Sequence, residues 1–138
     1  MRNGILVVLA TAMLVAGPSW AQVEKGDVFK GKLFPPNVIL EHQAELKLSK
    51  QQFTAIKKSV VEVQANVAEH EWDVREAYQN IMIELDKAPI DEDTTLEYVH
   101  AALLAENQVK KQQMAMLIRL KNLLTDEQLA YLEAIQKE

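Results

Sequence analysis

LSKQQ at residues 48–52 and LTDEQ at residues 124–128 are near copies of one five-residue pattern, and each stands before a helical stretch. The hydroxyl at the second position can accept a hydrogen bond from a backbone N–H that the first helical turn leaves unpaired. The glutamine at the fifth position can reach back to the N–H of the hydroxyl residue, which completes a capping box behind a leucine staple. The motif residues are Leu48, Ser49, Gln52, Leu124, Thr125 and Gln128.

The stretch after the first motif predicts a long helix. Its apolar residues alternate steps of three and four over several heptads, which is typical of a helix with one buried stripe. The stripe consists of Phe53, Ile56, Val60, Val63, Val67, His70, Val74, Ala77, Ile81 and Leu85. Ala88 is expected to end this helix, because a residue that precedes proline is pushed out of the α region.

Three further helices follow from the same signals. Pro36 suits the first turn of a short helix that runs to about Leu46. A second long helix is expected from about Glu92 to Asn122, and LTDEQ starts a final short one. The apolar members of the second long helix are Leu96, Val99, Leu103, Met114, Leu117, Ile118 and Leu120. Met116 is expected on its exposed side.

These patterns predict an all-α fold of four helices. The two long helices form an antiparallel hairpin about Pro89, and the two short helices flank its open end. One thin hairpin has few positions at which to bury both apolar stripes. We therefore expect a homodimer.

The charges are unevenly placed along the hairpin. The chain has 15 basic and 20 acidic residues among 138, and this acidic excess argues against nucleic acid as a partner. Antiparallel pairing gathers acidic residues at the tip and basic residues at the open end. The basic residues are candidates for partner binding: Lys57, Lys58, Arg119 and Lys121. The alternative is that both charged regions are ordinary solvated faces.

The N-terminus has the pattern of a secretory signal peptide. Arg2 precedes an apolar run from residue 5 to residue 16, and Ser19-Trp20-Ala21 offers small residues before a cleavage point. Cleavage would leave residues 22–138 as an exported chain with no stable membrane span, whereas a retained anchor is the alternative. Residues 22–33 are then expected to form a flexible arm, and residues 34–138 the helical domain.

Catalysis is not indicated by any motif. The sequence has no Cys and no Gly-rich phosphate loop, and its carboxylates are predicted mostly on exposed helix faces. Three histidines raise the alternative of a transition-metal site, but none has a second histidine one helical turn away. We therefore expect no cofactor. The alternative is a divalent transition metal held by His42 and His100, with Glu41, Glu45 or Glu62 as helpers.

The paired motifs, the signal peptide, the Pro35-Pro36 entry and the long hairpin together resemble the Spy/CpxP group of periplasmic proteins, the LTXXQ family. The resemblance implies a cradle-shaped antiparallel dimer in the periplasm of a Gram-negative bacterium. It also implies an ATP-independent chaperone that holds unfolded or misfolded envelope proteins. Two departures stand out. This chain is net acidic where Spy-like cradles are basic, and it lacks the paired histidines of the related ZraP-like and CnrX-like metal sensors.

Three functions therefore remain open from the sequence. The leading expectation is a periplasmic chaperone or envelope-stress adaptor. The first alternative is a periplasmic sensor or resistance protein that binds zinc, nickel, cobalt or copper. The second alternative is a signalling adaptor that docks on a sensor histidine kinase, as the resemblance to CpxP-like members implies.

Overall fold

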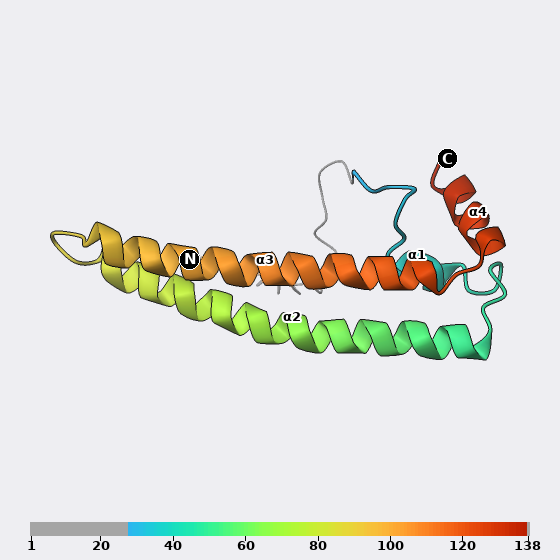
Figure 1. Cartoon of the computed structure of the whole chain (residues 1–138), viewed down its shortest axis with the longest axis horizontal. Helices are drawn as coiled ribbons and strands as arrows, with labels where there is room; N and C mark the ends of the chain where they lie inside the picture. Colours follow the sequence, from blue (N-terminus) through green and yellow to red (C-terminus); the bar gives the residue numbers. More distant parts are fainter. Residues whose placement is uncertain (1–27, 138) are drawn as a thin grey trace, which may run out of the picture.

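The computed structural model describes residues 28–137, and within this range it contains four helices and no β-strand. The helices are α1 (Pro36–Glu41), α2 (Lys50–Leu85), α3 (Glu92–Asn122) and α4 (Asp126–Ile135). Helices α2 and α3 lie side by side as an antiparallel hairpin, and α1 and α4 lie at its open end (Figure 1). The all-α prediction is confirmed. The predicted signal peptide and residues 22–27 lie outside the described residues.

Helix α1 is shorter than predicted, and the chain reaches α2 through a tight turn. Pro36 occupies the first turn of α1, where its missing N–H costs no hydrogen bond. The Leu48 N–H donates to the Gln43 carbonyl over 3.3 Å, and the Lys47 N–H donates to the Ala44 carbonyl over 3.1 Å. Lys47 has a φ of 49°. This is the hydrogen-bond pattern of a Schellman motif, with a lysine at the position that glycine usually takes.

We expect Lys47→Gly to raise the free energy of unfolding by about 1 kcal/mol, because glycine adopts positive φ without the clash of a Cβ atom. Urea denaturation measures this change. Lys47→Ala is the control, since it also removes the charge but keeps the Cβ atom, and it is expected to give no such gain. Equal stabilisation by both variants would contradict the argument.

The hydrophobic core is concentrated at the open end of the hairpin. There the side chains of α1 and α4 pack with the first half of α2 and the last half of α3. The buried members are Phe34, Ile39, Leu46, Ile56, Val63, Met116, Leu120, Leu124 and Leu132. Residues 28–33 reach this region as well, because the Gly31 N–H donates to Gln136 Oε1 over 2.6 Å. The tertiary structure is therefore anchored at the base of the hairpin.

Toward the tip, small and polar residues form the contact between the two long helices. Ala77 and Glu84 are buried on α2, and Thr95, Ala102 and Ala105 are buried on α3. Short side chains let the helix backbones approach closely but bury little apolar surface. We call the buried residues of α2 and α3 along which the two helices pack the seam. The seam is therefore rich in apolar contact at the base and poor at the tip.

Several residues of the predicted stripes lie outside this seam. Phe53 and Leu85, at the two ends of the α2 stripe, are exposed, and Glu84 is buried beside Leu85 instead. On α3 the prediction was wrong for three large residues, which are exposed: Leu96, Leu103 and Ile118. It was also wrong for Met116, which is buried where Met114 is only partly buried. In the tip half, the small residues Thr95, Ala102 and Ala105 form the buried face of α3, so that Leu96 and Leu103 of the same half are turned outward.

Candidate interaction surfaces

Both five-residue motifs form capping boxes. Ser49 Oγ accepts the Gln52 N–H, and Gln52 Oε1 accepts the Ser49 N–H, each over 3.0 Å. In the second copy Thr125 Oγ1 accepts the Gln128 N–H over 3.2 Å, and Gln128 Oε1 accepts the Thr125 N–H over 2.9 Å. Each box satisfies two backbone N–H groups at a helix start, one of them in the first turn.

The two glutamines also bind each other, 76 residues apart in the sequence. Gln52 Nε2 donates to Gln128 Oε1 over 2.7 Å, and Gln128 Nε2 donates to Gln52 Oε1 over 3.1 Å. The remaining amide hydrogens bind backbone carbonyls at 2.9 Å, from Gln52 to Leu123 and from Gln128 to Leu46. Both donors of each amide and its oxygen are thus used. The amide pair clamps the starts of α2 and α4 together and attaches the end of α3 and the turn before α2.

We expect Gln52→Glu to destabilise the fold by roughly 2–3 kcal/mol, because a carboxylate cannot donate to the Leu123 carbonyl or to Gln128 Oε1. Both hydrogen bonds are lost, and a carboxylate oxygen then faces two other acceptor oxygens. Thermal and urea denaturation measure the loss. Gln51→Glu is the matched control, since Gln51 is exposed on the same turn. Similar effects of the two variants would show that charge at the helix start, and not the amide pair, is responsible.

Large apolar side chains lie exposed around the tip half of the hairpin. They are Tyr78, Met82, Ile83, Leu85, Ile90, Leu96, Leu103 and Leu104. Single exposed apolar residues are common on soluble proteins, whereas a grouped set indicates a surface that contacts another molecule. Among the described residues, no helix is long and apolar enough to cross a membrane.

The two flanks of the hairpin differ in their charges. Tyr78 follows the buried Ala77 by one residue, whereas Glu62 precedes the buried Val63, so their side chains leave α2 on opposite sides of the seam. The Tyr78 hydroxyl donates to Glu106 over 2.8 Å, and this hydrogen bond raises the pKa of Tyr78. On the other flank Glu62 lies 3.6 Å from Arg119. We call these the Tyr78 flank and the Glu62 flank.

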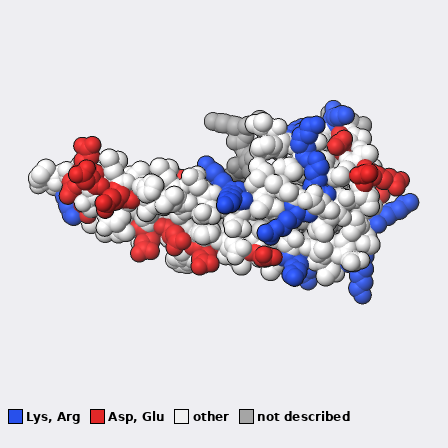
Figure 2. Space-filling view, viewed as in Figure 1, with Lys and Arg blue, Asp and Glu red and all other residues white. Residues whose placement is uncertain are grey.

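The acidic tip and the basic base expected from the sequence are visible in Figure 2, where acidic side chains crowd the tip and basic ones lie mainly over the other end. The four candidate cations do not form one patch, however. Lys57 follows the buried Ile56 and belongs to the Tyr78 flank, whereas Arg119 pairs with Glu62 on the other flank. Lys121 Nζ donates to the Lys32 carbonyl over 2.7 Å. Lys57 and its exposed neighbour Lys58 therefore remain the candidates with open surroundings.

The structure places the two candidate metal-binding histidines far apart. The ring of His42 stands edge-on to Tyr131 of α4, with Nδ1 3.5 Å from the tyrosine oxygen. His100 lies in the tip half of α3, roughly 30 Å of helix from the base. In the range 28–137 no group of three or more His, Cys, Asp and Glu side chains is placed to hold a metal ion. One chain therefore does not bring His42 and His100 together.

A buried carboxylate lies in the seam near the tip. Glu84 is 6% exposed, and its Oε1 lies 2.7 Å from Lys87 Nζ, which raises the pKa of Lys87. Its other oxygen, Oε2, is buried and has no hydrogen-bond partner. An unpaired buried carboxylate oxygen opposes folding, because it loses water and gains nothing in return. Glu84 therefore weakens the tip of the hairpin.

We expect Glu84→Leu to stabilise the hairpin by roughly 1–3 kcal/mol, because it replaces an unpaired buried oxygen with apolar surface. Urea denaturation, together with hydrogen exchange of the amides near Glu84 and Thr95, measures this. Glu76→Leu is the control, an exposed carboxylate of the same helix whose removal is expected to change stability by less than about 0.5 kcal/mol. A clear loss of stability in Glu84→Leu would contradict the expectation.

Comparisons of the chain with protein-family models, with curated proteins and with solved structures each found no match. The described residues form a helical hairpin. The Gln52–Gln128 pair holds its base together, and large apolar side chains are exposed at its tip.

Proposed function

We propose that this protein is a binding module that holds unfolded or misfolded proteins without ATP, as a chaperone or stress adaptor of the cell envelope. In this proposal it acts as a homodimer in the periplasm after removal of its signal peptide. The resemblance of its paired LTXXQ-like motifs to the Spy/CpxP group supports the proposal at the level of sequence.

The observation that carries the proposal is the reversal of packing at the tip. The seam there contains alanines, a threonine and Glu84, whereas leucines of α3 face outward. Leu96, Leu103 and Leu104 are each about half exposed. Apolar surface on a regular helix suits a client that offers apolar side chains without a fixed structure, because such contacts are non-directional.

The polar side chains next to this surface are suited to loose association. Glu97 and His100 interrupt the leucines along α3. Polar residues between apolar contacts keep the patch soluble and keep individual contacts weak, so that a client can dissociate and fold. Binding of this kind needs no nucleotide.

We expect the double variant Leu103→Gln, Leu104→Gln to lose at least half of the capacity to suppress aggregation of a chemically unfolded client. The reason is the loss of exposed apolar area on α3, while helix propensity is kept. Light scattering measures suppression, with the mature protein and client at near-equal concentrations, without ATP and in EDTA. Ile118→Gln is the matched control, an exposed apolar residue of α3 at the base.

The outcomes separate the proposed function from its competitors. Suppression by the wild type that falls in the double variant but not in the control supports client holding at the tip. Suppression that appears only after zinc or nickel is added would favour a metal-dependent protein. An absence of suppression under both conditions would refute client holding and favour a signalling adaptor.

A further inference from the structure

The exposed apolar side chains of the tip lie in an acidic stretch of the chain. Residues 76–106 cover the end of α2, the turn and the first half of α3, and they include eight acidic residues and one basic residue. The acidic residues are Glu76, Glu84, Asp86, Asp91, Glu92, Asp93, Glu97 and Glu106. All the exposed apolar residues named above for the tip fall within the same stretch. We call residues 76–106 the acidic tip region; its acidic side chains are visible in Figure 2.

The single lysine of this region does not cancel its charge. Lys87 Nζ lies 2.7 Å from Glu84 Oε1, so this lysine offsets one buried carboxylate. Asp91 accepts the Thr94 N–H over 3.0 Å, and this hydrogen bond lowers the pKa of Asp91 and keeps the carboxylate ionised. Eight carboxylates against one lysine leave a net formal charge of −7 on the region. The apolar surface of the tip therefore lies in a negative field.

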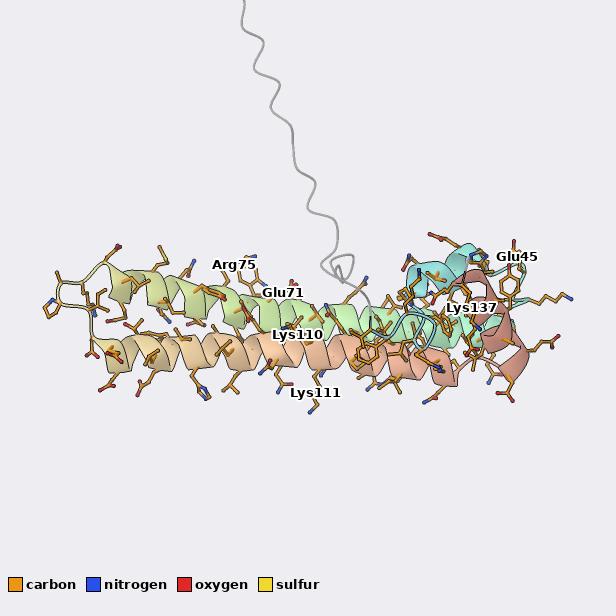
Figure 3. All side chains as sticks on the ribbon, turned by 90° about the horizontal axis from the view of Figure 1, so that it is seen from above. Glu45, Glu71, Arg75, Lys110, Lys111 and Lys137 are labelled. Atoms are coloured by element: carbon orange, nitrogen blue, oxygen red, sulfur yellow. The ribbon has the colours of Figure 1, made fainter. Side chains whose placement is uncertain are left out.

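The side of α3 that faces away from α2 combines charged and apolar residues in order. Residues seven positions apart lie on one face of a helix, and two such lines run beside each other here. They are Glu97, Leu104 and Lys111 in one line, and Leu96, Leu103 and Lys110 in the other, and all six are exposed. Figure 3 shows Lys111 on the side of α3 away from α2. We call these six residues the outer face of α3.

The outer face thus runs from acidic through apolar to basic along the helix. Glu97 and Lys111 are fourteen residues apart, which is roughly 21 Å along the helix axis. Screening limits the interaction of exposed charges to about 8–10 Å at physiological salt. A cation close to Glu97 therefore interacts with the acidic tip region and not with Lys111.

An apolar segment with basic side chains beside it fits this face. Its apolar residues can contact Leu103 and Leu104, which are each about half exposed. Its lysine or arginine side chains can then lie toward Glu97 and the tip, where opposite charge attracts them. A segment flanked by carboxylates would make the same apolar contacts but would be repelled by the net charge of −7.

We infer that the outer face of α3 selects client segments in which apolar residues are flanked by lysine or arginine. The inference rests on the proposed function, because it names the class of client that the protein holds. It also gives a role to the acidic excess that separates this chain from the basic Spy-like cradles. Exposed leucines supply the affinity, and the carboxylates around them choose the sequence.

Matched peptides test this preference directly. Three fluorescein-labelled peptides share a core of four apolar residues and carry two lysines, two glutamates or two serines at each end. We expect the lysine-flanked peptide to bind the mature protein at least fivefold more tightly than the serine-flanked one, and the glutamate-flanked peptide to bind most weakly. Fluorescence anisotropy measures the dissociation constants. Raising NaCl from about 50 to about 500 mM is expected to remove most of the difference, because salt screens exposed charges.

Variants with opposite expected signs test the location. We expect Glu97→Lys to weaken binding of the lysine-flanked peptide at least threefold, because it places a like charge beside the leucines. Lys111→Glu is expected to strengthen it at least twofold, because one end of the peptide then meets a carboxylate instead of a lysine. A misfolded variant would not bind more tightly. Leu103→Gln, Leu104→Gln is expected to lose binding of all three peptides.

Glu69→Lys is the matched control. Glu69 is an exposed carboxylate of α2 outside the acidic tip region, and its replacement changes the net charge as much as Glu97→Lys does. We expect it to leave the dissociation constant of the lysine-flanked peptide within about twofold of the wild type, because screening confines the effect to its surroundings. An effect as large as that of Glu97→Lys would overturn the assignment to the outer face.

The inference and the proposed function fail separately. Equal binding of the three peptides, or no measurable binding of the lysine-flanked one, overturns the inference even if the wild type suppresses aggregation. A lysine preference with the expected response of the variants supports the inference for this face even if no aggregation is suppressed, which would refute client holding alone.

Two other occupants of the outer face are separate outcomes. A Glu97→Lys variant that sediments differently from the wild type but binds the peptides unchanged would assign the face to a second copy. Equal binding of the three peptides, together with co-sedimentation on phosphatidylcholine vesicles, would assign it to a lipid surface. Either result overturns the inference.

Discussion

The reciprocal amide pair of Gln52 and Gln128 is the interaction on which the tertiary structure depends. Each glutamine caps its own helix through its oxygen and binds the other helix start through its nitrogen. Every polar atom of the two side chains is used, so that neither residue can be replaced alone without leaving the other unsatisfied. A local device for starting a helix thereby becomes the contact that holds α4, the end of α3 and the turn after α1 at one end of the hairpin.

From this clamped base the packing becomes weaker toward the tip. Large apolar side chains such as Ile56 and Leu120 give way to Ala77, Ala102 and the incompletely paired Glu84. Stability is therefore unevenly distributed, and the tip is expected to open locally at a lower free energy than the base. An exposed and easily deformed apolar surface is consistent with binding partners that have no single shape, because it can adapt to each of them.

The two long helices contact each other along one side only. The seam holds α2 and α3 together. The exposed leucines in the tip half of α3 lie outside this contact. They do so because a residue one position along from a seam member projects about a quarter-turn away from it.

The sequence by itself determined the four helices and where each begins, whereas α1 ends earlier than its sequence predicted. Caps, prolines and periodicity are local signals, so the two boxes, the hairpin about Pro89 and most of the α2 seam could be read directly. Only the tertiary structure decided which face of α3 is buried, because its polar middle leaves the periodicity undecided and close helix packing selects alanines over leucines. It likewise decided that Gln52 meets Gln128 and that His42 and His100 stay apart, since contacts between distant residues depend on how whole helices pack.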